Sequence, residues 1–114
     1  MEIRLPFPPS VNDMYANNKG RGRGRKPSAE YEAWKLEAGH KLNRQPHSLF
    51  KPRAIVFIDI DEKRQGDADN RAKPVLDLLV KHGVLAGDSK RYVKRVSIGW
   101  EAVDGCRVKL LGVE

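Results

Sequence analysis

The stretch Arg53-Ala-Ile-Val-Phe-Ile-Asp-Ile-Asp61 predicts a β-strand around which the other elements can be placed. Side chains alternate between the two faces of a strand. One face of this strand is therefore formed by Ala54, Val56, Ile58 and Ile60. The opposite face is apolar at first and acidic at its end. One fully apolar face indicates a sheet that buries this side under other elements.

Two helices are expected, one before and one after this strand. The first should begin at an N-cap at Ser28 and run to about Arg44. Its buried stripe is predicted to comprise Tyr31, Trp34, Ala38 and Leu42. The second should span about Asn70–His82 with Gly83 at its C-cap, and Pro74 near its first turn leaves its start open. Its inward side chains are predicted to be Val75, Leu76, Leu79 and Val80.

Three further strands complete a predicted order of β-α-β-α-β-β. Glu2–Phe7 alternates like a short strand, and Tyr92–Val103 reads as a long one. Cys106–Val113 follows Asp104-Gly105, which is a strong signal for a two-residue hairpin. We therefore expect an α/β fold of the two-layer α+β kind, with a small mixed sheet and two main helices. The chain of 114 residues has room for a single domain over residues 1–114.

The remaining composition indicates a soluble protein of the cytoplasm. Cys106 is the only cysteine, which excludes an internal disulfide and a cysteine zinc cluster. No apolar run approaches the ~20 residues of a membrane span, so no membrane partner is expected. The first residues do not resemble a signal peptide.

Positive charge dominates the chain. Lys and Arg number 22 against 15 Asp and Glu, which gives a formal net charge of +7. This balance favours a phosphate-rich partner, although solubility alone could also explain it. Residues 17–27, NNKGRGRGRKP, are expected to form a mobile basic loop that contacts DNA or remains merely solvated. The candidate DNA-binding residues are Lys19, Arg21, Arg23, Arg25 and Lys26 in this loop, with Arg71, Lys90 and Arg91 elsewhere.

Two acids in Gly66-Asp-Ala-Asp-Asn-Arg-Ala-Lys73 are the candidate metal ligands. Asp67 and Asp69 are separated by one residue and lie where a strand hands over to a helix. In an extended turn the two side chains would point the same way and could bind one Mg²⁺. The alternative is that these short acids cap the helix and complement its dipole.

A lysine and a third acid strengthen the metal-site hypothesis. Lys73 follows Asp69 by one helical turn and could hold a phosphate, or could simply pair with Asp69. Asp88 lies in a Gly-flanked loop, where it could be catalytic or could form an Asx turn or N-cap. The weaker acidic candidates, interpreted as surface charges or ion-pair partners, are Asp59, Asp61, Glu62 and Asp77. Cations around the acids are Lys63, Arg64, Arg71, Lys81, Lys90, Arg91, Lys94 and Arg95.

Three segments of the chain resemble the RusA-type Holliday junction resolvases, which are small crossover-junction endodeoxyribonucleases of bacteria and their phages. The resemblance includes the order of the segments and their spacing along the chain. The first is Leu5–Asn12 (LPFPPSVN), followed by the basic loop and Ser28-Ala-Glu. The second is Asp67-Ala-Asp-Asn with Lys73, and the third is Gly83–Asp88 (GVLAGD). The resemblance extends over nearly the whole chain.

The resemblance implies a homodimeric nuclease that depends on Mg²⁺, with Mn²⁺ as a substitute, and cuts four-way junction DNA by paired symmetric nicks. Asp67, Asp69 and Asp88 match the catalytic, metal-binding acids of the family, and Lys73 matches its catalytic lysine. Pro74 departs from the small helix former of some relatives, and Leu76 replaces an aromatic associated with opening the junction.

Three other functions are compatible with the sequence. The protein could be a non-catalytic accessory that binds branched DNA in recombination, in which case the acids would only shape the start of the helix. It could be a nuclease for flaps, other branched DNA or RNA, because hydrolysis of any phosphodiester needs similar metal chemistry. A basic protein could also bind RNA or a protein partner.

Overall fold

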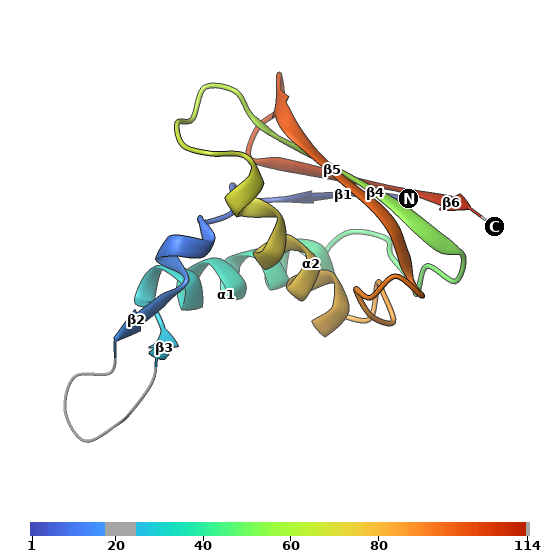
Figure 1. Cartoon of the computed structure of the whole chain (residues 1–114), viewed down its shortest axis with the longest axis horizontal. Coiled ribbons are helices and arrows are strands. Elements are labelled where there is room, and N and C mark those ends of the chain that lie inside the picture. Colours follow the sequence, from blue (N-terminus) through green and yellow to red (C-terminus); the bar gives the residue numbers. More distant parts are fainter. Residues whose placement is uncertain (18–24, 114) are drawn as a thin grey trace.

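Four strands form a mixed sheet, and both helices pack on one of its faces (Figure 1). The computed structural model describes residues 1–17 and 25–113 of the chain. The sheet has the order β1-β6-β4-β5, formed by β1 (Glu2–Leu5), β4 (Arg53–Asp61), β5 (Val93–Glu101) and β6 (Cys106–Val113). β4 and β5 are parallel, and the other two pairs are antiparallel. The predicted mixed sheet with two main helices is confirmed.

β4 lies inside the sheet and alternates as predicted. Its four inward side chains, Ala54, Val56, Ile58 and Ile60, are fully buried. The inward residues of β6, among them Val108, belong to the same hydrophobic cluster as the buried faces of the helices. Proline shortens the edge strand β1, which ends at Leu5 instead of the predicted Phe7, because Pro6 has no N–H to donate to a ladder.

Helix α1 (Ala29–Asn43) has the predicted cap and buried stripe. The Ser28 Oγ accepts a hydrogen bond from the Tyr31 N–H at 3.1 Å and donates one to the Asp13 carbonyl at 2.6 Å. The predicted stripe, Tyr31, Trp34, Ala38 and Leu42, is buried. The indole N–H of Trp34 donates to the Pro6 carbonyl at 3.1 Å and ties α1 to the end of β1.

Helix α2 (Ala72–Lys81) begins later than predicted, after a 3₁₀ turn, η2 (Asp69–Arg71). Pro74 falls in the first turn of α2, where backbone N–H groups have no partner within the helix, so it costs no helical hydrogen bond. The predicted inward face needs correction. Val75, Leu78 and Leu79 are buried, whereas Leu76 and Val80 are only partly buried. In the described ranges no helix is long and apolar enough to cross a membrane.

The predicted hairpin between the last two strands is wrong. Gly105 adopts the expected left-handed conformation, with φ of 64°, but β5 and β6 lie on opposite sides of β4. The crossover through α2 places β5 parallel to β4, on one side of it. Residues 102–105 then pass the end of β4, where the Asp61 N–H donates to the Gly105 carbonyl at 3.0 Å. The local turn sequence was read correctly, but it does not determine which strands pair.

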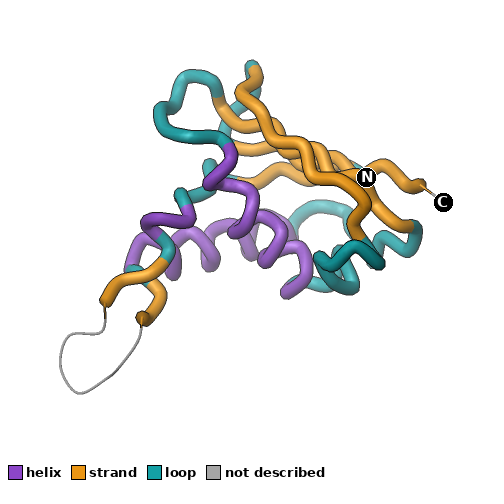
Figure 2. Tube along the Cα trace, viewed as in Figure 1, coloured by secondary structure: helices purple, strands orange, loops and turns teal. Residues whose placement is uncertain are grey.

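A small second sheet lies beside the helices (Figure 2). It follows a short 3₁₀ turn, η1 (Val11–Asp13), and pairs β2 (Tyr15–Asn17) with β3 (Arg25–Pro27) in antiparallel register. The sequence predicted a loop over residues 17–27, so its two ends are corrected to strand. The ring of Tyr15 packs edge-on against Tyr31, with centroids 6.0 Å apart, which anchors this sheet to α1.

Candidate active site

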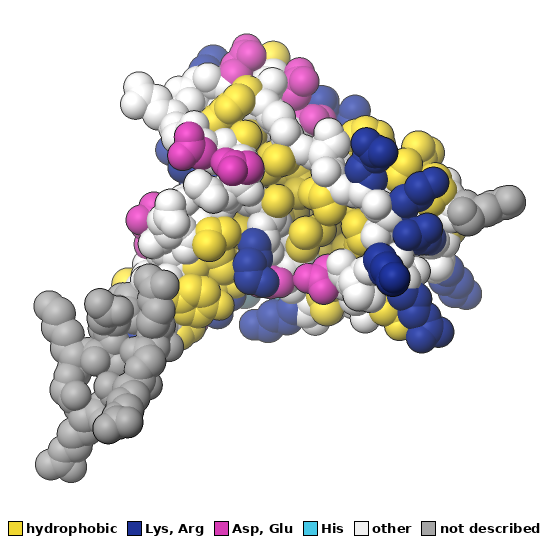
Figure 3. All heavy atoms as spheres, in the orientation of Figure 1, with side chains coloured by type: hydrophobic (Ala, Val, Ile, Leu, Met, Phe, Trp, Pro, Cys, Tyr) yellow, Lys and Arg dark blue, Asp and Glu magenta, His cyan; other side chains and the backbone are white. Residues whose placement is uncertain are grey.

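The two candidate metal ligands lie between β4 and α2. Asp67 is exposed in the loop after β4, and Asp69 is the first residue of η2. Figure 3 shows acidic side chains gathered where this loop approaches α2. Ala68 between them has right-handed helical angles, φ −69° and ψ −43°, so the predicted extended turn is not present. Both carboxylates nevertheless belong to one short, solvent-accessible segment.

Neither acid caps a helix. The N-cap position of η2 is Ala68 and that of α2 is Arg71, and neither provides a side-chain capping hydrogen bond. Within residues 1–17 and 25–113, no hydrogen bond or ion pair engages the carboxylates of Asp67 and Asp69. The capping explanation that the sequence allowed therefore does not account for the pair. Two exposed carboxylates are oxygen ligands of the type that Mg²⁺ prefers.

Lys73 lies one helical turn beyond Asp69 and is half exposed. Its Nζ is 3.4 Å from an oxygen of Asp77, so the pairing with Asp69 that the sequence allowed is not the one observed. A surface ion pair of this kind contributes at most about 1 kcal/mol. A substrate phosphate could therefore compete for the ammonium group.

Asp88 lies at the other end of α2. The helix has 10 residues, which corresponds to about 15 Å. Asp67 and Asp69 precede it, while Asp88 follows it, in a loop tied to the start of β4 by the Ala54 N–H donating to the Tyr92 carbonyl at 2.8 Å. Figure 1 shows the two loops at opposite ends of α2. The chain thus brings Asp67, Asp69 and Lys73 together but leaves Asp88 apart.

The described part of the chain contains no group of three or more His, Cys, Asp or Glu side chains that could hold a metal ion. Within these residues, Asp67 and Asp69 are thus a pair of carboxylates and do not belong to a larger cluster of such side chains.

The loop that carries Asp88 is held in place by an aromatic ring. A Cβ on Gly87 would lie 2.8 Å from the Tyr92 ring, which explains the glycine beside the acid. The guanidinium of Arg91 lies over the same ring, 5.5 Å from its centroid. The Nε of Arg53 donates to the Lys90 carbonyl at 2.8 Å. These contacts fix the position of Asp88 relative to the start of β4.

A basic surface surrounds this second loop. Two predicted DNA-binding residues, Lys90 and Arg91, are exposed there, and the neighbouring Lys94 and Arg95 are exposed as well. Figure 3 shows Lys and Arg side chains gathered over this side of the molecule, away from the acidic loop. The acidic and basic candidates are therefore separated along α2.

Arg71 was grouped with the DNA contacts, but its guanidinium binds the protein itself. Nη1 donates to the Pro8 carbonyl at 2.8 Å, and Nη2 donates to the Gln65 carbonyl at 3.4 Å. The group also lies over the Phe7 ring, 4.7 Å from its centroid. Arg71 thereby fastens the acidic loop to the segment after β1. Short-range sequence patterns carry no signal for this contact, because Arg71 and Pro8 are far apart in the chain.

Two of the five predicted DNA-binding residues from the basic segment lie in β3. Lys26 is an exposed residue of β3, and Arg25 is part of the same strand. Lys19, Arg21 and Arg23 lie outside the described residues. DNA binding by all five stays a prediction.

Asp59 is confirmed as an ion-pair partner, since its carboxylate lies 2.8 Å from the Arg107 guanidinium, and Asp77 is confirmed as one through its contact with Lys73.

No protein-family model matches the chain, and no curated protein matches it significantly.

Proposed function

We propose that the protein is a metal-dependent endodeoxyribonuclease that resolves four-way DNA junctions by paired symmetric nicks in recombination and repair. The observation that carries the proposal is the carboxylate pair of Asp67 and Asp69, exposed and without a capping role at the start of α2. The order of the three RusA-like segments supports the choice of substrate, and the net charge of +7 supports a nucleic-acid partner. Action on cellular DNA agrees with the cytoplasmic location expected from the sequence.

In this proposal, Asp67 and Asp69 bind Mg²⁺, which Mn²⁺ can replace. A bound divalent cation would polarise the scissile phosphate, help to generate the attacking hydroxide and offset charge on the leaving 3′ oxygen. Lys73 orients the phosphate and stabilises the negative charge that develops on it. The products are 5′-phosphate and 3′-hydroxyl ends.

The proposed homodimer completes the site. Asp88 lies beyond the end of α2, whereas the carboxylate pair precedes its start. We assign the third acid of each site to Asp88 of the partner subunit. Two copies related by a two-fold axis would then present two equivalent sites to two equivalent strands of a junction.

Replacement of Asp69 by Asn tests the proposal. The Asp69→Asn variant should lose at least about 100-fold in the rate of cleavage of a synthetic four-way junction in Mg²⁺, because the neutral amide is a poorer metal ligand. Binding of the junction in Ca²⁺ should persist. The matched control is Asp104→Asn, which removes another exposed carboxylate outside the acidic loop. Cleavage at the wild-type rate by Asp69→Asn would show that the catalytic assignment is wrong.

The separation of Asp88 from the carboxylate pair favours a second candidate, a non-catalytic protein that binds branched DNA. In that case wild type and Asp69→Asn would bind the junction equally and neither would cut it in Mg²⁺ or Mn²⁺. A panel of junctions, flaps, linear duplexes and RNA at one salt concentration would then separate the junction resolvase from a nuclease for other branched nucleic acids. Paired nicks at symmetric positions of the junction are the expected result.

A further inference from the structure

A cavity of about 320 Å³ lies next to the acidic loop. Its walls include Phe7 and Pro8 from the segment after β1, and Arg64, Gln65 and Arg71 from the loop and turn after β4. Gln65 precedes Asp67 by two residues, so the cavity and the carboxylate pair are built from the same loop. A group bound in this cavity would therefore lie beside the proposed metal site.

Two guanidinium groups share one aromatic ring in this cavity. The Cζ of Arg64 lies 4.9 Å from the centroid of Phe7, and the Cζ of Arg71 lies 4.7 Å from the same centroid. Phe7 is itself stacked on Trp100, with centroids 6.3 Å apart, which holds the ring in place. Cation–π contact with the ring favours each arginine, but the two like charges repel each other.

The two arginines differ in how their donors are used. The terminal nitrogens of Arg71 bind the Pro8 and Gln65 carbonyls, and its buried Nε has no hydrogen-bond partner in the described part of the chain. Gly66 lies close over this guanidinium, since a Cβ there would clash with Nη2 of Arg71. Arg71 is thus a positioning residue that contributes its charge while it holds the loop.

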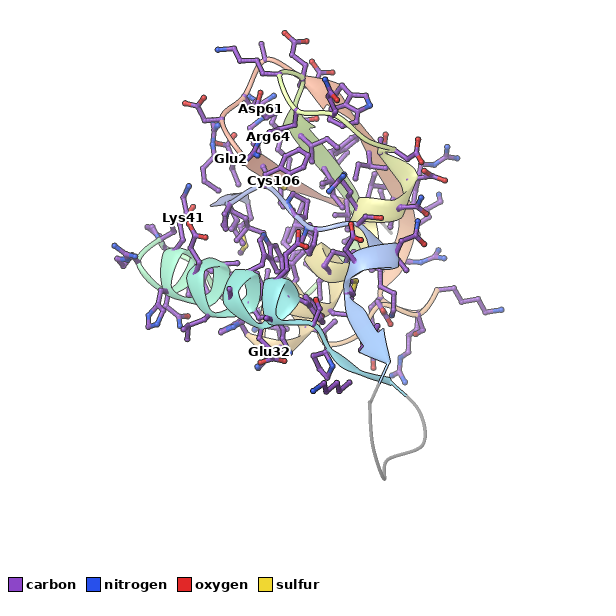
Figure 4. All side chains as sticks on the ribbon, turned by 90° about the vertical axis from the view of Figure 1, so that its left-hand side faces the viewer. Glu2, Glu32, Lys41, Asp61, Arg64 and Cys106 are labelled. Atoms are coloured by element: carbon purple, nitrogen blue, oxygen red, sulfur yellow. The ribbon has the colours of Figure 1, made fainter. Side chains whose placement is uncertain are left out.

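Arg64 is the residue whose donors remain available. It is exposed and lies next to Asp61 at the end of β4 (Figure 4). Its side chain has no hydrogen bond and no ion pair with any residue in the described ranges. A guanidinium offers five N–H donors in a planar arrangement that matches two oxygens of a phosphate. Glu30 is the one acid on the cavity wall, and no ion pair joins it to either arginine.

We propose that this cavity binds a backbone phosphate of a nucleic-acid strand, with Arg64 donating hydrogen bonds to it and Arg71 supplying a second positive charge. The inference rests on the proposed function, because it places a phosphate of the substrate beside Asp67 and Asp69. The phosphate would compensate the two neighbouring cations and seat the strand next to the carboxylates. Phe7 holds Arg64 in the orientation that the contact requires.

The test measures DNA binding without cleavage. Wild type, Arg64→Gln and the control Lys63→Gln are titrated against a labelled four-way junction in Ca²⁺ over a series of salt concentrations. Lys63 is the matched control because it is an adjacent exposed cation that lines a different cavity, with Asp61, Glu62 and Asp104. Arg64→Gln should bind about three- to tenfold more weakly and lower the slope of log K against log[salt] by about 0.9, the contribution of one phosphate contact on duplex DNA. Lys63→Gln should leave the slope unchanged.

Two further measurements distinguish a lost phosphate contact from loss of stability and from binding of a free anion. Thermal unfolding of Arg64→Gln should match that of wild type, because the side chain is exposed, and a weaker affinity would then reflect a lost contact. In the NMR spectrum of wild type, DNA binding should shift the Arg64 Nε–H signal. Inorganic phosphate should shift the same signal only at concentrations far above those of the DNA. A shift at equal concentration would assign the cavity to a free anion instead.

The outcomes separate this inference from the nuclease proposal. An unchanged salt slope for Arg64→Gln would overturn the phosphate site even if the protein cuts junctions. A reduced slope in a protein that never cuts DNA would retain the phosphate site and refute the nuclease. Absence of DNA binding by wild type would overturn both.

Discussion

At the scale of single residues, burial controls the chemistry of the cysteine. Cys106 begins β6 and is fully buried against the cluster that includes Leu5 and Ile60. Burial raises the pKa of the Cys106 thiol to about 12, with a smaller contribution from the nearby Asp59 carboxylate. The thiolate is the reactive form, so the residue is an inert core side chain in the native protein.

This burial predicts how the thiol responds to pH. The folded pKa of about 12 lies above the ordinary value of 9.0. The associated stability is therefore complete below pH 9 and is lost as the pH rises toward 12. At pH 8 a thiol reagent should label the native protein at least about 100-fold more slowly than the urea-unfolded protein. Equal rates in the two states, measured by absorbance of the released chromophore, would contradict the burial of Cys106.

The sequence could identify some residues of the site but not their neighbours. Asp67 and Asp69 were found because two carboxylates one residue apart repel each other, and a divalent cation would offset that repulsion. Arg64 was named only as one of several cations around the acids, and its contact with Phe7 was not predicted, because that contact joins a residue near the start of the chain to one beyond β4. Short-range patterns carry no signal for such a contact.

At the scale of elements, the end of α2 depends on backbone geometry. Gly83 has φ of 75°, its N–H donates to the Val80 carbonyl at 3.2 Å, and the Val84 N–H donates to the Leu79 carbonyl at 2.9 Å. This pair of hydrogen bonds is the Schellman arrangement that closes a helix. Beyond it, the chain enters the loop that carries Asp88. The glycine predicted at the C-cap therefore also determines where that acid lies.

The variant Gly83→Ala tests this role of the backbone. A Cβ at Gly83 would have no heavy atom within 4 Å, so any cost comes from the left-handed conformation alone. We expect a loss of about 1 kcal/mol in the free energy of unfolding. The control is Gly99→Ala in β5, where space is also open but φ is not positive, and no comparable loss is expected. Equal stability of the two variants in urea denaturation would contradict the argument.

Elements were predicted better than their pairing. The extent of β4 and the cap of α1 follow from alternation and from Ser28, which are local signals. The neighbours of β5 depend on the direction in which α2 returns the chain, and that is a property of the crossover. Asp104-Gly105 therefore marks a turn correctly and indicates the wrong strand pair. The pair β2 and β3 was missed because the basic, glycine-rich composition between them resembles a loop.

At the scale of the whole molecule, the acidic and the basic candidate residues lie at opposite ends of α2. The acidic loop with Asp67 and Asp69 precedes the helix, and Asp88 follows it among exposed cations that include Lys90 and Arg91. If two copies associate with their α2 helices antiparallel, the start of one helix approaches the end of the other. Each carboxylate pair would then meet Asp88 and the basic surface of the partner subunit. The sequence could not show this, because it gives no distance between the acids.

Subunit complementation distinguishes a shared site from a site within one protomer. Asp69→Asn and Asp88→Asn, each with a different affinity tag, should be inactive alone on a four-way junction in Mg²⁺. In a purified heterodimer of the two, the Asp88→Asn subunit keeps its carboxylate pair and receives Asp88 from the Asp69→Asn subunit. One of the two sites is then intact. We expect cleavage to return at up to about half the wild-type rate and to produce single nicks, because the second site lacks both acids.

The control heterodimer combines Asp67→Asn with Asp69→Asn, in which both subunits carry a damaged carboxylate pair, so neither site can be rebuilt by exchange. It should remain inactive, and its inactivity would show that recovery in the first heterodimer comes from a shared site and not from residual wild-type protein. If the Asp69→Asn and Asp88→Asn heterodimer also stays inactive, the three acids do not act across the dimer. Since α2, a helix of 10 residues and so about 15 Å long, lies between Asp88 and the carboxylate pair in the chain, Asp88 would then lie outside the metal site, and catalysis would rest on Asp67, Asp69 and Lys73 alone.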